Sequence, residues 1–180
     1  MRIIPAGCDV ELRPVAAGDA DALFAAVERN RERLRRWLPW VTPDYSRDDV
    51  GRFLAEKHEE NCSGVALTTS IWSGDNLCGA IGLHRIDARH RSSSIGYWID
   101  AAYEGRGIVT RACRAIVDEA FGAYGLHRIE IRCATCNSRS AAIASNLGFV
   151  LEGTLREAEW LHDRWVDLYV FRMLEHEWSE

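Results

Sequence analysis

Residues 96–110 read G-Y-W-I-D-A-A-Y-E-G-R-G-I-V-T and are the part of the chain that best indicates its fold. The first of these residues have the composition of a strand, and the apolar spacing of residues 111–123 predicts a helix directly afterwards. Between the two elements, Gly105 and Gly107 flank Arg106, so the backbone can turn sharply and lie close to a ligand. The unpaired N–H groups and the dipole of the helix favour an anion at this turn. The sequence therefore predicts an anion site that suits a phosphate.

Two common phosphate-binding motifs are absent from the chain. It contains neither G-x-x-x-x-G-K-[ST] nor a G-x-G-x-x-G after a first strand, so nucleotide hydrolysis and dinucleotide binding have no support. The turn instead resembles the pyrophosphate-binding motif Gln/Arg-x-x-Gly-x-Gly/Ala of the GCN5-related N-acetyltransferases (GNATs). Glu104, Gly107 and Val109 occupy its three defined positions, and only the glycine has the usual identity. A plain loop made by Gly105 and Gly107 is the alternative.

The composition predicts one soluble domain. With 180 residues and 47% hydrophobic content, the chain is long enough for one buried core, which we expect to span about residues 10–175 of a single domain, 1–180. The net charge of −5 provides no basic surface for a nucleic-acid backbone. The first residues do not form a signal peptide, and no run reaches the roughly 20 apolar residues that cross a membrane. We therefore expect a cytoplasmic protein that binds neither nucleic acid nor membrane.

Six cysteines are scattered over predicted helices and strands, so we expect reduced thiols in an intracellular chain. Residues 133–136 form a C-x-x-C, but no second pair and no nearby His-x-x-x-His completes a tetrahedral site. We therefore expect no metal.

The remaining sequence alternates between strand and helix patterns. The expected strands are residues 10–14, 64–72, 77–85, 94–99, 128–133, 149–155 and 165–174. Asp19 should cap the first expected helix, residues 20–36, which has five arginines at its far end. The second expected helix covers residues 46–61 and should start with a capping box made by Ser46 and Asp49. The others cover residues 111–123 and 138–147. Strands grouped first and alternating with helices later predict an α/β (mixed α+β) fold. Its central sheet should be mixed and mostly antiparallel, with helices on both faces.

A second group of residues strengthens the resemblance to the acetyltransferases. Asn137, Ser140 and the pair Gly148-Phe149 have the spacing of a helix start and a helix stop, which needs no function. Together with the glycine turn, however, they resemble the GNAT pattern of Asn-x-x-Ser, a short helix and Gly-Phe. In that family the asparagine contacts the coenzyme A arm.

The segments G-Y-W-I-D, E-G-R-G-I, L-G-F-x-L-E-G and A-E-W-L narrow the resemblance to the RimL/RimJ-like ribosomal-protein N-terminal acetyltransferases. This resemblance covers nearly the whole chain after Val10 and implies a GNAT fold, acetyl-CoA as co-substrate and a homodimer. It assigns Glu159 as general base, with Glu157 as nearest rival, and Ser140 as the group that serves the departing thiolate. The amide of Ile99 would stabilise the oxyanion. The implied cofactor-binding residues are Ile99, Gly105, Arg106, Gly107, Ile108, Val109, Thr110 and Asn137.

The chemistry accounts for these residue types. An amine is protonated near neutral pH and attacks a thioester only after a base has removed its proton, which a carboxylate can do directly or through water. We expect direct transfer of the acetyl group to a protein N-terminal α-amine, by resemblance that of a ribosomal protein, without an acyl-enzyme. Two alternatives stay open: acetylation of a small amine such as an antibiotic or a polyamine, and a catalytically silent acyl-CoA-binding module.

Residues 29–45 are ambiguous in sequence. The arginine run between Arg29 and Arg36 indicates either a docking patch or, as we prefer, a solvated helical face, because Glu28 and Glu32 dilute its charge. Trp37 and Trp40 flank a Leu-Pro step and could line a binding mouth or pack a loop onto the core.

Overall fold

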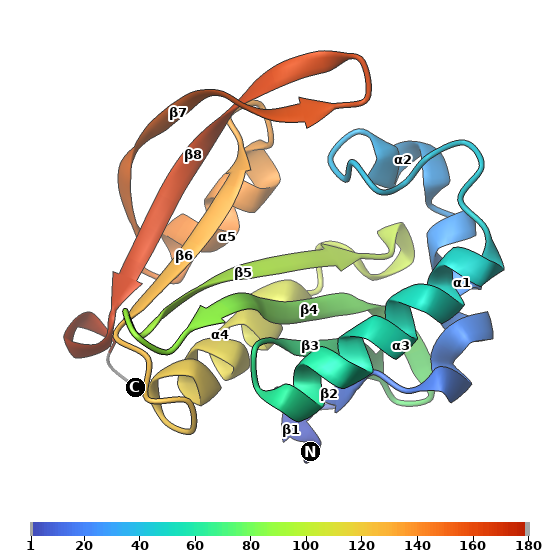
Figure 1. The fold of residues 1–180 in the computed structure, drawn as a ribbon, viewed down its shortest axis with the longest axis horizontal. Helices are drawn as coiled ribbons and strands as arrows, with labels where there is room; N and C mark the ends of the chain where they lie inside the picture. Colours follow the sequence, from blue (N-terminus) through green and yellow to red (C-terminus); the bar gives the residue numbers. More distant parts are fainter. Residues whose placement is uncertain (1, 179–180) are drawn as a thin grey trace.

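The computed structural model describes residues 2–178, and within them the chain forms one sheet of eight strands in the order β1-β2-β3-β4-β5-β6-β8-β7 (Figure 1). The strands are β1 (Ile4–Pro5), β2 (Val10–Pro14), β3 (Leu67–Ser73), β4 (Asn76–Asp87), β5 (Ser92–Ile99), β6 (Arg128–Ala134), β7 (Val150–Leu161) and β8 (Arg164–Leu174). The helices are α1 (Ala20–Glu28), α2 (Arg31–Arg35), α3 (Arg47–Ser63), α4 (Ile108–Phe121) and α5 (Ser138–Asn146). Short 3-10 turns cover Ala17–Asp19, Ala101–Tyr103 and Glu175–Glu177. None of the helices in this described part is long and apolar enough to cross a membrane.

Helices cover both faces of the sheet, which confirms the expected fold class. Helices α1 and α3 lie on one face, and α4 and α5 lie on the other (Figure 1). The main core forms beneath α4 and α5, while α1 and α3 cover a smaller cluster around Leu23 and Leu54. Helix α3 begins as its sequence predicts. The Ser46 side chain accepts from the Asp49 N–H, and the Asp49 carboxylate accepts from the Ser46 N–H. It ends at Gly64, whose φ of +75° suits glycine.

The sheet opens between two neighbouring strands in its interior, β5 and β6. These strands run parallel, joined by the α4 crossover, and their pairing stops at Ile95 opposite Ile131. Strand β5 nevertheless continues to pair with β4 as far as Ile99, opposite Gly79. Residues 96–99 therefore have a strand neighbour on one side only, while β6, β8 and β7 curve away on the other (Figure 1). This wedge leaves backbone groups of β5 available to a ligand.

Several expected element boundaries are wrong, for identifiable reasons. The first expected helix, residues 20–36, is two helices that break at Arg29 and Asn30, whose side chains bond to Asp100 and Ala101, directly after β5. Asp19 does not cap α1 with its side chain but accepts from the Ala16 N–H, at 3.1 Å. Helix α4 begins at Ile108, directly after Gly107, rather than at residue 111. Strand β7 runs on past residue 155 because a bulge carries it to residue 161.

Candidate active site

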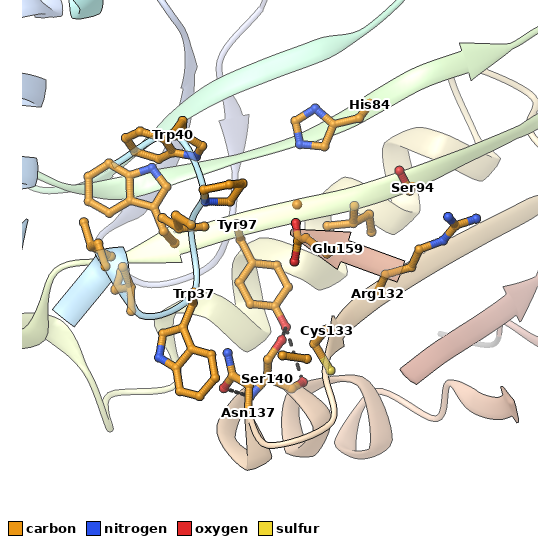
Figure 2. A pocket seen from close by; sticks show the side chains of 18 of the residues that line it. Trp37, Trp40, His84, Ser94, Tyr97, Arg132, Cys133, Asn137, Ser140 and Glu159 are labelled. Carbon is orange, nitrogen blue, oxygen red and sulfur yellow. Dashed lines mark hydrogen bonds between the residues drawn. The ribbon is translucent and has the colours of Figure 1, made fainter. Parts of the chain in front are cut away.

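A cleft of about 2110 Å³ opens where the wedge meets α2, α5 and β7. Figure 2 shows it from close by, with Tyr97 and Ser140 near its centre and Glu159 beside them. Five of the expected site residues line it: Ile99, Val109, Asn137, Ser140 and Glu159. The other five do not line this cleft: Gly105, Arg106, Gly107 and Ile108 lie between two positions that do, Glu104 and Val109, and Thr110 directly follows Val109 in α4.

Glu159 is placed in the cleft by the bulge in β7. The register of β7 against β8 shifts between Leu155 and Glu159, and Glu157 within the bulge has a φ of +47°. Burial raises the pKa of Glu159, and no cationic side chain among residues 2–178 forms an ion pair with it. The carboxylate therefore has the character of a proton acceptor. Glu157, the rival candidate, is exposed and does not line the cleft.

Ser140 is hydrogen-bonded to a tyrosine that the sequence interpretation did not assign. The Tyr97 hydroxyl lies 2.8 Å from the Ser140 Oγ, across the wedge from β5 to the first turn of α5 (Figure 2). Burial raises the pKa of Tyr97, so its hydroxyl stays protonated and can donate to Ser140. Ser140 is then free to donate its own proton into the cleft. The contact joins residues far apart in the chain, so no local motif could have revealed it.

Backbone amides on the open side of β5 are available to a ligand. The Asp100 N–H donates to the Cys78 carbonyl of β4, at 2.7 Å. Because the hydrogen-bonding groups of a strand alternate between its two sides, the N–H groups of Tyr97 and Ile99 point away from β4 and toward the wedge. The Ile99 carbonyl, on that same side, accepts from Arg33. The predicted oxyanion donor is therefore directed as its proposed role requires.

The glycine turn has the geometry that its sequence predicts. Gly107 is the residue before α4 and has a φ of +68°, and Gly105 has a φ of +74°. Left-handed backbone at both positions brings the first N–H groups of α4 to the surface of the turn. Ile108 is only 4% exposed and packs in the main core, so its side chain anchors the turn and only its backbone faces a ligand. Arg106 is exposed and stacks on Tyr103, with 5.2 Å between guanidinium carbon and ring centroid.

Asn137 fits both of the roles considered for it. Its side-chain oxygen accepts from the Ser140 N–H at 3.2 Å and therefore caps α5. The same residue lines the cleft, so the helix-cap role and a ligand contact are compatible. Gly148, with a φ of +82°, follows the other end of α5 as the sequence predicts.

The segment of residues 31–45, which we call the acceptor loop, lines the cleft opposite α5. Its start is fixed by Arg31, which donates to the carbonyls of Thr42 (2.6 Å) and Tyr45 (2.7 Å). Arg33 also points inward, so the expectation of a solvated arginine face is wrong for these two residues, while Arg35 and Arg36 are exposed. For Trp37 and Trp40, both interpretations of the sequence hold in part: lining a binding mouth and packing a loop onto the core.

Trp37 packs against the small cluster of Ala134, Leu161 and Val166, and Trp40 lies 5.4 Å from the Tyr45 ring and is 40% exposed. Both tryptophans line the cleft. Trp37 therefore packs against the β7–β8 hairpin, whereas Trp40 is partly exposed; Figure 2 shows both among the side chains that line the cleft.

Comparisons with known proteins agree with this geometry. Residues 9–150 match the family model described as "Acetyltransferase (GNAT) domain". The ribosomal-protein-serine acetyltransferase of Escherichia coli (strain K12) is 30% identical over 162 residues, which cover 90% of each chain. RimL, a ribosomal L7/L12 alpha-N-protein acetyltransferase solved with coenzyme A, superposes with a TM-score of 0.93 at 25% identity, over 96% of this chain and 98% of that one. The microcin C7 self-immunity acetyltransferase MccE, solved with acetyl-CoA and AMP, gives 0.89 at 26% identity and 94% coverage of both chains.

The chain therefore belongs to the GNAT acetyltransferases. Within that family it is an acetyl-CoA-dependent N-acetyltransferase, similar in sequence and fold to the RimL and RimJ type of ribosomal-protein acetyltransferase. The expected family is confirmed, and with it an enzyme rather than a silent binding module.

Proposed function

We propose that this enzyme transfers the acetyl group of acetyl-CoA to the N-terminal α-amine of a protein, and that the acceptor is a ribosomal protein. The observation that carries the proposal is the pairing of an unpartnered, half-buried Glu159 with the Tyr97–Ser140 hydrogen bond in one cleft. This pairing supplies a base for an amine and an acid for a thiolate. The similarity to the ribosomal-protein-serine acetyltransferase supports the choice of acceptor.

The residues present fit acetyl-CoA as co-substrate. Left-handed glycines expose the first amides of α4 at the turn, and Arg106 and Arg111 add positive charge there. The wedge beside β5 exposes the amides of Tyr97 and Ile99 to the thioester oxygen. Asn137 and Val109 line the cleft between the turn and Ser140.

The proposed reaction is a direct transfer in which each of three groups has one task. Glu159 accepts a proton from the acceptor amine, directly or through water, so that nitrogen can attack the acetyl carbonyl. The Ile99 N–H stabilises the negative charge that develops on the carbonyl oxygen. Ser140 donates its proton to the coenzyme A sulfur as the carbon–sulfur bond breaks, while Tyr97 donates to Ser140. No cysteine takes part.

A small-amine acetyltransferase is the second candidate, and the similarity to MccE favours it. A polyamine is a less suitable acceptor, because the charged side chains that line the cleft in the described structure are nearly balanced, with seven basic and six acidic residues. A polycation gains less affinity from a cleft with balanced charges than from one in which carboxylates predominate. A peptide with one amine and a neutral or acidic body fits this balance better.

The deciding experiment offers both acceptor classes at once. The protein is incubated with acetyl-CoA and short peptides that begin with Ser, Ala or Met, with amine-bearing antibiotics and spermidine in parallel reactions. Tandem mass spectrometry then locates each acetyl group. Acetylation of a peptide α-amine supports the proposal and ranks the first residues, whereas acetylation of small amines alone would assign the second function.

The resemblance also implies a homodimer, which we retain as a proposal. Strand β7 lies at the edge of the sheet and exposes Val150, Leu151 and Leu155, between 41% and 48% of each residue. An exposed apolar edge strand tends to be covered in solution. Sedimentation velocity of the wild-type chain measures the state directly.

A further inference from the structure

Glu104 places a negative charge beside the anion site, in the first position of the turn. A carboxylate there would oppose a phosphate unless its charge were compensated. Two arginines compensate it from opposite walls of the cleft: Arg33 of α2 pairs with the Oε1 atom, and Arg139 of α5 pairs with the Oε2 atom. All three residues line the cleft. Glu104 therefore links α2 and α5 electrostatically across the entrance to the wedge.

The two arginines are held very differently. Arg139 is 79% exposed along its side chain, and its ion pair with Glu104 is the one contact recorded for its guanidinium within residues 2–178. Arg33 is 30% exposed and also donates to the Ile99 carbonyl and to the Asn30 side chain, at 3.2 Å. An anion that arrives at the turn can therefore take Arg139 away from Glu104 at little cost, whereas Arg33 stays in place.

Arg33 is connected to the acceptor loop through packing. Its neighbour Leu34 is buried in a small cluster with Val27 and Val41, to which Leu38 and Tyr45 also contribute. This cluster is separate from the main core, and Tyr45 and Trp98 connect it to the cluster beneath α1 and α3. A stronger ion pair between Glu104 and Arg33 should therefore make the acceptor loop, which carries Trp37 and Trp40, more ordered.

We propose that Glu104 is a positioning residue that couples coenzyme A binding to the acceptor loop. The proposal rests on the coenzyme site assigned above. When coenzyme A binds, its pyrophosphate forms an ion pair with Arg139 and so breaks the pair between Arg139 and Glu104. Glu104 then pairs with Arg33 alone, and this pair fixes α2 and residues 37–45 in the position that binds the acceptor. By thermodynamic linkage, a bound acceptor tightens coenzyme A binding by the same factor.

Hydrogen–deuterium exchange with mass spectrometry tests the coupling on the full chain without a known acceptor. In the wild type, saturating coenzyme A should slow exchange both at the turn (residues 104–110) and in the acceptor loop (residues 31–45). In Glu104→Gln the turn should stay protected by coenzyme A, while the protection of the loop falls by at least half. Glu175→Gln, which removes a carboxylate paired with Arg91 outside the cleft, should behave as the wild type.

Arg139→Gln separates this coupling from a merely structural role. Once Arg139 is removed, Glu104 already holds Arg33 alone, so the acceptor loop should exchange slowly even without coenzyme A. The dissociation constant for coenzyme A should rise about two- to fivefold, since one exposed charge contact is lost. A purely structural role predicts faster loop exchange in this variant instead.

The outcomes distinguish the coupling from the site on which it depends. Protection of the turn without protection of the loop in the wild type, or equal loop protection in Glu104→Gln, would overturn the coupling and leave the coenzyme site intact. Absence of protection at the turn would overturn the coenzyme site and the coupling with it.

Discussion

At the scale of single residues, the carboxylate that we propose as the catalytic base lies in an environment that disfavours its ionised form. Burial in the cleft raises the pKa of Glu159, so the ionised form costs folding free energy above the ordinary carboxyl pKa. Below that pKa both the folded and unfolded chains bind the proton, and the cost vanishes. As pH rises through the folded pKa, the full cost is present. Replacing such a carboxylate by a neutral side chain should therefore raise the free energy of unfolding at neutral pH.

We predict that Glu159→Gln lowers turnover by about 10²- to 10⁴-fold and leaves coenzyme A binding unchanged. At neutral pH the variant should also have a higher free energy of unfolding than the wild type, with the difference disappearing near pH 4. Denaturant unfolding at the two pH values and steady-state kinetics measure these effects. Glu157→Gln is the matched control, because this exposed neighbour does not line the cleft. Wild-type turnover in Glu159→Gln would exclude the residue as base.

The same pKa predicts the pH dependence of activity. Glu159 must be ionised to accept a proton, so kcat/KM should rise as pH increases through a pKa that lies above the ordinary carboxyl value of 4.5. A second rise in kcat/KM should follow as the α-amine of the acceptor loses its proton, with a pKa of about 7.7–8.0. The lower limb should be absent from the residual activity of Glu159→Gln. Persistence of that limb in the variant would assign it to another group.

Tyr97 and Ser140 should behave as one unit. We expect Ser140→Ala to lower kcat by about 10²-fold and Tyr97→Phe by about 10-fold, with little change in the KM for acetyl-CoA. Because Tyr97 acts through Ser140, the double variant should lose no more than Ser140→Ala alone. Steady-state kinetics of the three variants measures this coupling. Fully additive losses would mean that Tyr97 contributes independently.

At the scale of elements, two glycines in the same left-handed conformation allow an effect on stability to be separated from an effect on binding. Gly107 and Gly64 have φ values of +68° and +75°, and they lie before α4 and after α3. An alanine at either position should lower the free energy of unfolding by about 1 kcal/mol. Only Gly107→Ala should also weaken coenzyme A binding, because a new Cβ would lie on the surface of the turn. Calorimetric titration of both variants decides this, and equal affinities would remove the turn from the coenzyme site.

The sequence predicted those elements whose signals are local. The Ser46 and Asp49 capping box, the Gly148 helix stop and the glycine turn each depend on a few neighbouring residues, and each is present. The break between α1 and α2 was missed because Asn30 is held by the N–H of Ala101, on a distant segment. Helical spacing alone carries no information about such a partner.

The candidate site was predictable only through the resemblance, and incompletely. Residue types alone left Ser140 and Glu159 as an ordinary helix-start hydroxyl and a strand-end carboxylate. The structure adds Tyr97 and the ion pairs of Glu104, which join residues 43, 71 and 35 positions apart. Contacts of this kind depend on the order of strands in the sheet, and no motif in the chain encodes that order.

At the scale of the whole molecule, the main core spans the junction between the two halves of the sheet, where β5 pairs with β6. Ile95 and Ile131 are the last paired residues of β5 and β6, and both are buried beside α4. We predict that Ile131→Ala lowers the free energy of unfolding by about 2–5 kcal/mol, because the cavity lies where both halves of the sheet meet. Ile3→Ala, at a 52% exposed residue, should change it by less than about 0.5 kcal/mol. Urea unfolding measures both changes. A small effect of Ile131→Ala would mean that other core residues contribute most of the free energy of unfolding.

The order of the last strands also governs when the enzyme becomes active during its synthesis. Within residues 2–178, β7 pairs with β8 alone, yet β8 follows it in the chain and lies between it and β6. A nascent chain that has released Glu159 from the ribosome therefore still lacks the strand that will hold this carboxylate in the cleft. The acetyltransferase can assemble its site only after residues 164–174 have left the exit tunnel, so the release of Glu159 alone does not make the enzyme active.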